Sequence, residues 1–284
     1  MNYLRFKNKV VDSIKDYLPE EFKEYNVEVE MIPKVNGFKE AIIISKSDCK
    51  DPTPTLYVDQ LYDQYKVCKN MDKVLKFAAE FYIYGINYGK AMAECITVEN
   101  SDDTVIMMLI NRDNNKDLLE TMPHRDYMDL AIVYRLIMPL PDGSFNTANI
   151  TDDMLERMGK TEEELFSLAV VNTQRILPPH TENIGESVNI VTNEKGIIGA
   201  VAMLYDEQLK NLADMVDSDL YIIPSSIHEV ITIPVYDADP DHLAEIVADA
   251  NNTVLKPKDV LSNSVYYYTR SIVSIDIIRE GIAV

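Results

Sequence analysis

The sequence contains no tryptophan and only three cysteines, four histidines and nine glycines among its 284 residues. Cys49, Cys68 and Cys95 are odd in number and form no CxxC pair, which favours a reducing, cytoplasmic compartment over a disulfide framework. No two histidines lie three or four residues apart, so no local motif supplies metal ligands. We therefore expect neither a metal site nor a cofactor.

Long apolar runs and basic residues are also scarce. No segment reaches the ~18 uninterrupted apolar residues that a membrane helix needs. Residues 1–7 alternate charged and apolar side chains and lack the apolar stretch and cleavage site of a secretory signal. The chain has 27 Lys and Arg against 47 Asp and Glu, a net charge of −20. We expect no membrane association and no direct nucleic-acid binding, because a basic footprint is missing.

Standard catalytic motifs are absent or fail on inspection. No HExxH, GxSxG or GxGxxG occurs in the sequence. The tripeptide His124-Arg125-Asp126 matches the catalytic tripeptide of kinases, but the asparagine required five residues after the aspartate is Ala131. That match is accidental, and the balance favours a binding protein over an enzyme.

The periodicity of apolar residues predicts an α+β fold with mixed or antiparallel sheets, hairpins and packed helices. Asn36-Gly37 separates two strand-like runs and is typical of a tight hairpin turn. Thr161 with Glu164 predicts a capping box at a helix start. Residues 189–192 and 197–204 flank a polar turn, and they predict a further hairpin.

The order of these elements also suggests how the chain is divided. Strand content restarts after a helical block, which places a boundary near residues 97–103. We expect an N-terminal α+β subdomain over residues 1–100 and a C-terminal α+β subdomain over residues 101–284. A single domain is the alternative.

One candidate catalytic segment follows the apolar run at residues 220–223. Ser225, Ser226, His228 and Glu229 have the residue types of a nucleophile, its base and a carboxylate. Neighbours on an extended chain point to opposite faces, which favours a turn-capping serine and a packed histidine instead. A hydrolase or transferase built on these four residues is the alternative to a binding function.

Candidate partner-binding residues come from the tyrosine-rich part of the chain. Tyrosine combines a large apolar ring with a polar tip and is common at binding surfaces. We single out Tyr57, Tyr62 and Tyr65. Tyr62 and Tyr65 lie at helical spacing, so the competing interpretation is that they support the edge of a core.

A second candidate surface is acidic. Residues 237–255 contain five acids and no Lys or Arg: Asp237, Asp239, Asp241, Glu245 and Asp249. An acidic face can mimic DNA phosphates and capture a basic DNA-binding protein. The competing interpretation is a solvated acidic face without a partner.

Several segments carry a resemblance to a known family. They include Pro54–Val58, Ser218–Val230 and Leu261–Tyr268. The chain resembles domain-of-unknown-function proteins of gut clostridia, many of them encoded near conjugative or other mobile elements. Met154–Asn172 and Leu220–Glu229 are also similar to the uncharacterised YtpQ-like proteins.

This resemblance implies a bacterial, cytoplasmic protein and assigns no activity, catalytic residue or cofactor. Together with the residues themselves, it leads to one leading hypothesis. We expect an acidic, non-enzymatic interaction protein that serves as a mobile-element accessory factor or as a decoy for a basic DNA-binding partner.

Overall fold

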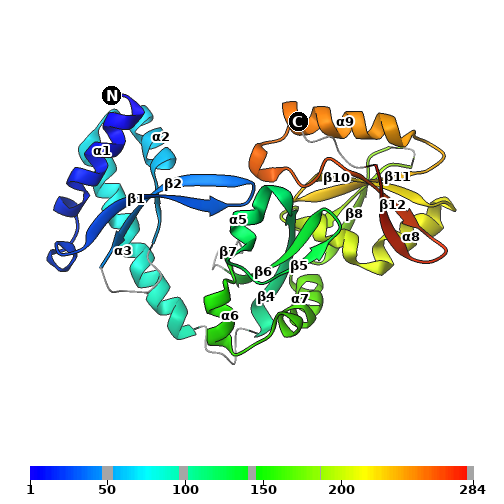
Figure 1. Cartoon of the computed structure of the whole chain (residues 1–284), viewed down its shortest axis with the longest axis horizontal. Coiled ribbons are helices and arrows are strands. Elements are labelled where there is room, and N and C mark those ends of the chain that lie inside the picture. Colours follow the sequence, from blue (N-terminus) through cyan, green and yellow to red (C-terminus); the bar gives the residue numbers. More distant parts are fainter. Residues whose placement is uncertain (47–53, 96–101, 140–144, 186, 280–284) are drawn as a thin grey trace. The chain divides into compact units, whose positions relative to one another are not determined.

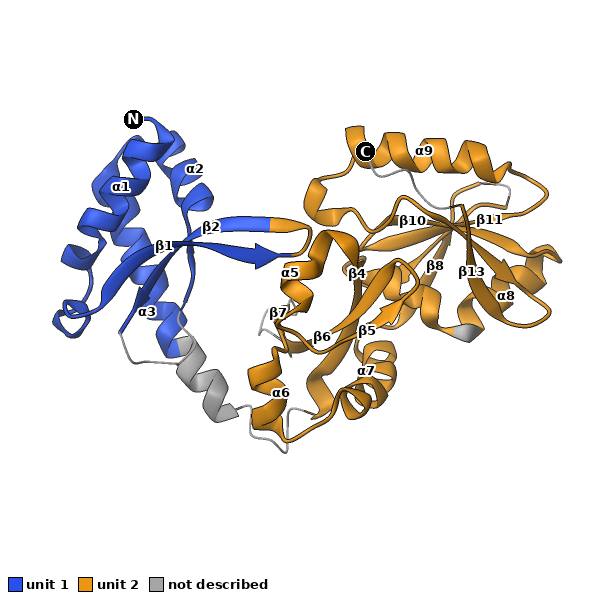
Figure 2. Cartoon of the chain, in the orientation of Figure 1, with its two compact units in different colours: residues 1–34, 38–100 blue, residues 35–37, 101–284 orange. Residues whose placement is uncertain are grey.

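The computed structural model describes residues 1–46, 54–95, 102–139, 145–185 and 187–279, with the backbone alone described at 88–95 and 206. The chain divides into two compact units (Figure 2). The first comprises Met1–Lys34 with Phe38–Asn100, and the second comprises Val35–Gly37 with Ser101–Val284. In the described part of the chain, helices combine with three antiparallel sheets, which confirms the predicted α+β class.

The first unit consists of a three-stranded sheet and helices (Figure 1). Its elements are α1 (Tyr3–Ser13), β1 (Asn26–Lys34), β2 (Gly37–Ser45), β3 (Leu56–Tyr57), α2 (Val58–Cys68) and α3 (Met71–Cys95). Two short 3-10 helices, Ile14–Tyr17 and Glu20–Phe22, follow α1. The strand order is β1-β2-β3, and Asn36 adopts a φ of 59° at the predicted hairpin turn.

The core of the first unit is built by the apolar face of α1. Phe6 and Val10 lie four residues apart and are fully buried, as the helical period predicts. They belong to one cluster with α3 residues such as Leu75 and Tyr82. The buried Tyr82 hydroxyl donates to the carbonyl oxygen of Ile44 at 2.7 Å, which fixes α3 against the sheet.

The second unit begins with a four-stranded sheet centred on its longest strand. Its elements are β4 (Val105–Asn111), α5 (Lys116–Leu119), β5 (His124–Tyr127), β6 (Leu130–Pro139), β7 (Phe145–Asn149), α6 (Asp152–Met158) and α7 (Glu162–Ile176). β4, β5 and β7 all pair with β6 in antiparallel register. The Thr161 capping box is confirmed at the start of α7.

The rest of the second unit is a six-stranded sheet with the order β13-β12-β10-β11-β9-β8. Its elements are β8 (Pro179–Asn183), β9 (Asn189–Asn193), α8 (Asp206–Val216), β10 (Leu220–Ser226), β11 (Glu229–Pro234), α9 (Pro240–Thr253), β12 (Val265–Thr269) and β13 (Ser274–Arg279). α9 covers one face, where Leu243 and Val247 pack against Tyr221 and Val265 (Figure 1).

The hairpin predicted from residues 189–192 and 197–204 is wrong. β9 pairs with β8 and β11, and Gly199–Leu204 form a 3-10 helix. The helix lies very close to β9 at Gly199, where an added Cβ would be 2.2 Å from Thr192 Oγ1 and 2.6 Å from the His228 carbonyl oxygen. The absence of a side chain at Gly199 lets the 3-10 helix pack closely against β9 instead of pairing with it as a strand.

A buried network around Asp129 ties the two sheets of the second unit together. Asp129 lies in the turn between β5 and β6, after Met128 with a φ of 55°. Its carboxylate accepts hydrogen bonds from Ser262 Oγ at 2.5 Å, Ser264 Oγ at 3.0 Å and the Tyr266 hydroxyl at 2.5 Å. Burial, followed by the charge of Asp129, holds the pKa of Tyr266 well above its ordinary value. The phenol is therefore a donor at neutral pH.

We predict that Asp129→Asn lowers the free energy of unfolding by about 2–4 kcal/mol, because an amide replaces a charged acceptor of three buried hydroxyl groups. Urea denaturation followed by circular dichroism measures the change. The control is Asp237→Asn on the exposed loop before α9, with an expected change within about 0.5 kcal/mol. Equal effects of the two substitutions would contradict the assigned role of Asp129.

Candidate functional site

The candidate catalytic segment forms the turn between β10 and β11. Ser226 is buried, and its Oγ accepts a hydrogen bond from the backbone N–H of His228 at 3.0 Å. Ser226 pairs with Glu229 across the ladder, and the register shifts between Ile223 and Ser226. Ser225 is half-buried on the same irregular strand end. The hydroxyl of Ser226 therefore stabilises the turn.

Both ring nitrogens of His228 contact other parts of the second unit. Nδ1 accepts a hydrogen bond from the Ile198 N–H at 3.1 Å, and Nε2 lies 3.4 Å from Asp259 Oδ1. This network assigns the proton to Nε2. The imidazole thus joins Ile198, which precedes the 3-10 helix Gly199–Leu204, to Asp259, which lies in the segment between α9 and β12. A hydrolase or transferase at this turn stays a prediction.

The predicted tyrosines lie on the surface of the first unit. Tyr62 and Tyr65 are partly buried against its core and lie with their ring planes 17° apart and centroids 6.3 Å apart. Both rings also contact Phe6. The Tyr57 ring lies under the ammonium groups of Lys34 and Lys39, at 5.4 and 5.2 Å. These contacts give each ring a structural role, and partner binding by the three tyrosines stays a prediction.

The five predicted acids are all exposed, on α9 and the loop before it. Two of them have structural roles. Asp239 caps α9 by accepting from the Asp241 and His242 N–H groups, and Asp241 forms an ion pair with Arg279. Glu245 lies 3.7 Å from His242, with its side chain 81% exposed. Because Asp241, Glu245 and Asp249 recur every four residues, they follow one face of α9 at steps of about 6 Å.

The charge of the protein is concentrated in the second unit. Residues 1–100 contain 14 basic and 16 acidic residues, a net charge of −2. Residues 101–284 contain 13 basic and 31 acidic residues, a net charge of −18. The acidic potential is therefore a property of the second unit rather than of the whole chain.

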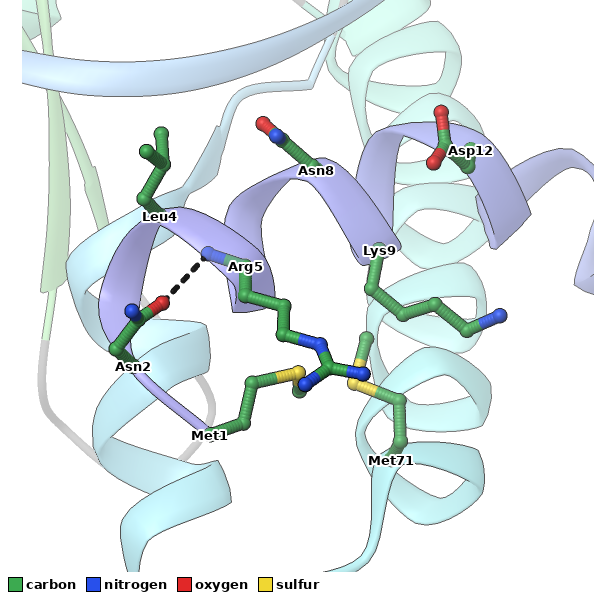
Figure 3. Close-up of a pocket in the computed structure, with 8 residues that line it drawn as sticks. All are labelled: Met1, Asn2, Leu4, Arg5, Asn8, Lys9, Asp12 and Met71. Atoms are coloured by element: carbon green, nitrogen blue, oxygen red, sulfur yellow. Dashed lines mark hydrogen bonds between the residues drawn. The ribbon is translucent and has the colours of Figure 1, made fainter.

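The first unit carries an open groove of different character along α1 (Figure 3). It has a volume of about 790 Å³ and is lined by Met1, Asn2, Leu4, Arg5, Asn8, Lys9, Asp12 and Met71. Figure 3 shows the Arg5 side chain extending toward the two methionines. With Lys9 one turn further along the same helix, the groove is locally cationic.

Sequence reasoning missed a charged cluster centred on Arg125 of β5. Its guanidinium donates to both carboxylate oxygens of Glu162, at 3.2 and 2.9 Å, and to Glu163 at 2.5 Å. It also lies 3.9 Å from the centroid of the Phe166 ring, and Glu162 accepts a further hydrogen bond from the Tyr134 hydroxyl. No sequence pattern signalled these contacts, because β5 and α7 are almost 40 residues apart.

The cluster shifts the ionisation of its members. Burial opposes ionisation of Glu162, but hydrogen bonds from Arg125 and Tyr134 outweigh it and hold the pKa of Glu162 below its ordinary value. Burial and the Glu162 carboxylate raise the pKa of Tyr134. Glu162 is therefore an anion at neutral pH, and the Arg125 charge is matched locally.

Two features are absent from the described residues. No group of three or more histidine, cysteine or acidic side chains is arranged to hold a metal ion there. None of the described helices combines the length and the apolar character needed to cross a membrane. Cys68 is a free, exposed cysteine, whereas Cys49 lies outside the described residues.

The fold and these sites define an α+β protein with an acidic second unit. The chain belongs to a family of unknown function (DUF5688), which matches residues 3–189 and 185–270. None of the curated proteins and none of the solved structures matches it. The resemblance to a domain-of-unknown-function family is thereby confirmed at that level. Its gut-clostridial, mobile-element and YtpQ-like parts stay predictions.

We predict that Gly199→Ala lowers the free energy of unfolding by about 2–4 kcal/mol, because the new methyl group overlaps backbone atoms of His228 and Asn193. Chemical denaturation measures it. Gly185→Ala is the matched control: its Cβ would meet its nearest neighbour at 3.7 Å, an ordinary contact. A tolerated Gly199→Ala would show that the 3-10 helix is not held as closely against β9 as the structure indicates.

We also predict a pH-dependent effect of Glu162→Gln. Since the folded pKa of Glu162 is depressed, its charge stabilises the folded state above the ordinary carboxyl value of about 4.5. That contribution is lost as the pH falls through the folded pKa. The variant should be less stable by about 1–2 kcal/mol at pH 7, with the difference shrinking below pH 4.5.

Urea denaturation of both proteins across this pH range measures the effect. Glu156→Gln on α6 is the control, because Glu156 is exposed. Its difference from the wild type should stay near zero throughout. A Glu162→Gln difference that is independent of pH would contradict the assigned ion pair.

Proposed function

We propose that the protein binds a basic, DNA-binding protein partner through the acidic surface of its second unit, as a decoy for DNA. The observation that carries this proposal is the segregation of charge, −18 over residues 101–284 against −2 over residues 1–100. A charge of this size steers a cationic partner toward one part of the molecule and repels polyanions.

The surface on α9 supports the proposal locally. Asp241, Glu245 and Asp249 form a regular row on an exposed helix face, and Asp237 precedes the helix. Of the five acids at this surface, Asp241 forms a close ion pair, with Arg279. A row of carboxylates on a rigid helix presents charge at a fixed spacing, as a phosphate backbone does.

The proposal extends to the setting of the interaction. We place the binding in the cytoplasm, where an exposed free thiol such as Cys68 stays reduced. We further propose that the partner belongs to the machinery of a mobile element, which makes this chain an accessory factor. The family resemblance supports that last step.

A triple substitution tests the surface without disturbing the helix. Asp237→Asn, Glu245→Gln and Asp249→Asn remove three charges and leave the Asp239 cap and the Asp241 ion pair intact. The matched control removes three exposed acids elsewhere in the second unit: Asp117→Asn, Glu120→Gln and Glu156→Gln. The two variants have the same net charge.

The measurement is capture of proteins from a bacterial lysate on the immobilised wild type and on both variants. We predict a basic, DNA-binding protein that double-stranded DNA displaces. Its affinity falls about tenfold on the α9 variant and less on the control, because each exposed charge contributes up to ~1 kcal/mol. A partner that binds all three proteins equally, or capture that DNA does not compete, would refute the proposal.

A further inference from the structure

A cavity in the second unit lies at the junction of its two sheets, away from α9. It has a volume of about 270 Å³. Its lining is drawn from β5, β6, α7, the 3-10 helix Gly199–Leu204, α8, β12 and β13, with the turn before β13. The lining residues are Arg125, Asp126, Tyr127, Ile132, Phe166, Met203, Leu204, Leu209, Tyr268, Val273 and Ile275.

The deeper lining is apolar and closed to solvent. Ile132, Met203, Leu209 and Tyr268 are each no more than 3% exposed. Phe166 and Ile275 are half-buried and complete an apolar and aromatic wall. An apolar cavity of ~150 Å³ suffices for one benzene ring, so about 270 Å³ accommodates a single-ring molecule with a short substituent.

One part of the wall is held in an unfavourable backbone conformation. Val273 has a φ of 52°, a region that β-branched residues rarely adopt. The turn that carries it is fixed by Arg270, whose N–H donates to Asp219 at 2.8 Å and whose Nε donates to Asp214 at 2.6 Å. Strain that the surroundings maintain is typical of binding sites.

The charges at the wall favour a cation. Arg125 is matched by Glu162 and Glu163, while Asp126 has its nearest cation, Arg112, 3.9 Å away. Arg125 and Asp126 line the cavity, and together with the neighbouring Glu162, Glu163 and Arg112 they sum to −1, within a unit of net charge −18. An anionic ligand would find the Arg125 guanidinium already occupied by two carboxylates, whereas a cation enters an attractive field.

From the apolar depth, the aromatic lining and the acidic surroundings together, we infer that this cavity binds a small aromatic amine. The ring lies among Phe166, Tyr268 and Met203, where aromatic and sulfur contacts stabilise it. The ammonium group remains toward Asp126 of β5 rather than toward the Arg125 guanidinium. The inference goes beyond the proposed capture of a basic protein, since neither the cavity nor its ligand involves α9.

The test uses three probes with one ring and different charge: benzylamine, benzyl alcohol and benzoate. Ligand-observed NMR titration of the full chain at low salt measures each affinity. We expect saturable binding of benzylamine, with benzoate at least about fivefold weaker because of the like charge around the cavity. Benzyl alcohol should fall between them. Absence of saturation for benzylamine, or benzoate binding equally well, would overturn the inference.

Matched variants locate the binding. Ile275→Trp on β13 fills the cavity and should weaken benzylamine at least about tenfold. Ile277→Trp is the control, because Ile277 is half-buried on the same strand and does not line the cavity. If thermal unfolding shows that Ile275→Trp does not fold, the benzylamine affinity of Phe166→Leu serves as the test instead. It removes a wall ring and should weaken benzylamine several-fold. Unchanged affinity in a folded cavity variant would overturn the inference.

Discussion

The carboxylate of Asp129 is the constraint on which the second unit depends. It accepts hydrogen bonds from the hydroxyl groups of Ser262, Ser264 and Tyr266, which lie more than 130 positions later in the chain. Nearby, the Asn111 amide donates to the Leu261 carbonyl oxygen at 3.0 Å and reinforces the same junction. A tie across so long a loop is costly to form in chain entropy, and the three buried hydroxyl groups that converge on one half-buried carboxylate make it specific. Asp129 joins the two sheets of the second unit, and the cavity is lined by strands of both sheets.

Three arginines of the second unit are paired with acidic side chains. Arg125 forms ion pairs with two glutamates, and Arg279 forms one with Asp241. Arg270 forms ion pairs with Asp214 and Asp217, and its backbone N–H donates a hydrogen bond to Asp219. Each of these three arginines uses more than one hydrogen-bond donor. Residues 101–284 contain 18 more acidic than basic side chains, so pairing with every base would still leave 18 carboxylates uncompensated. The few basic residues of this unit thus form ion pairs with some of its acids, and the excess of acidic residues gives the unit its negative potential.

Local signals in the sequence predicted most elements and few of the contacts between them. The Asn36 turn and the Thr161 box could be found because each depends on residues within four positions. The strand prediction at Gly199 was wrong, and the close packing of this residue against Thr192 and His228 involves residues 7 and 29 positions away that the local pattern does not reveal. Asp129 and Arg125 were missed for the same reason. Their partners are far along the chain, and polar contacts between elements leave no period in a sequence.

The central claim is that binding is electrostatic and located on α9, and the salt dependence of affinity tests it most directly. The dissociation constant of the captured basic partner would be measured from about 0.05 to 0.5 M salt for the wild type and the α9 variant, a range over which screening of exposed charges increases strongly. The account predicts steep weakening with salt for the wild type and a shallower slope for the variant. A dissociation constant that does not change with salt, or identical slopes, would contradict it.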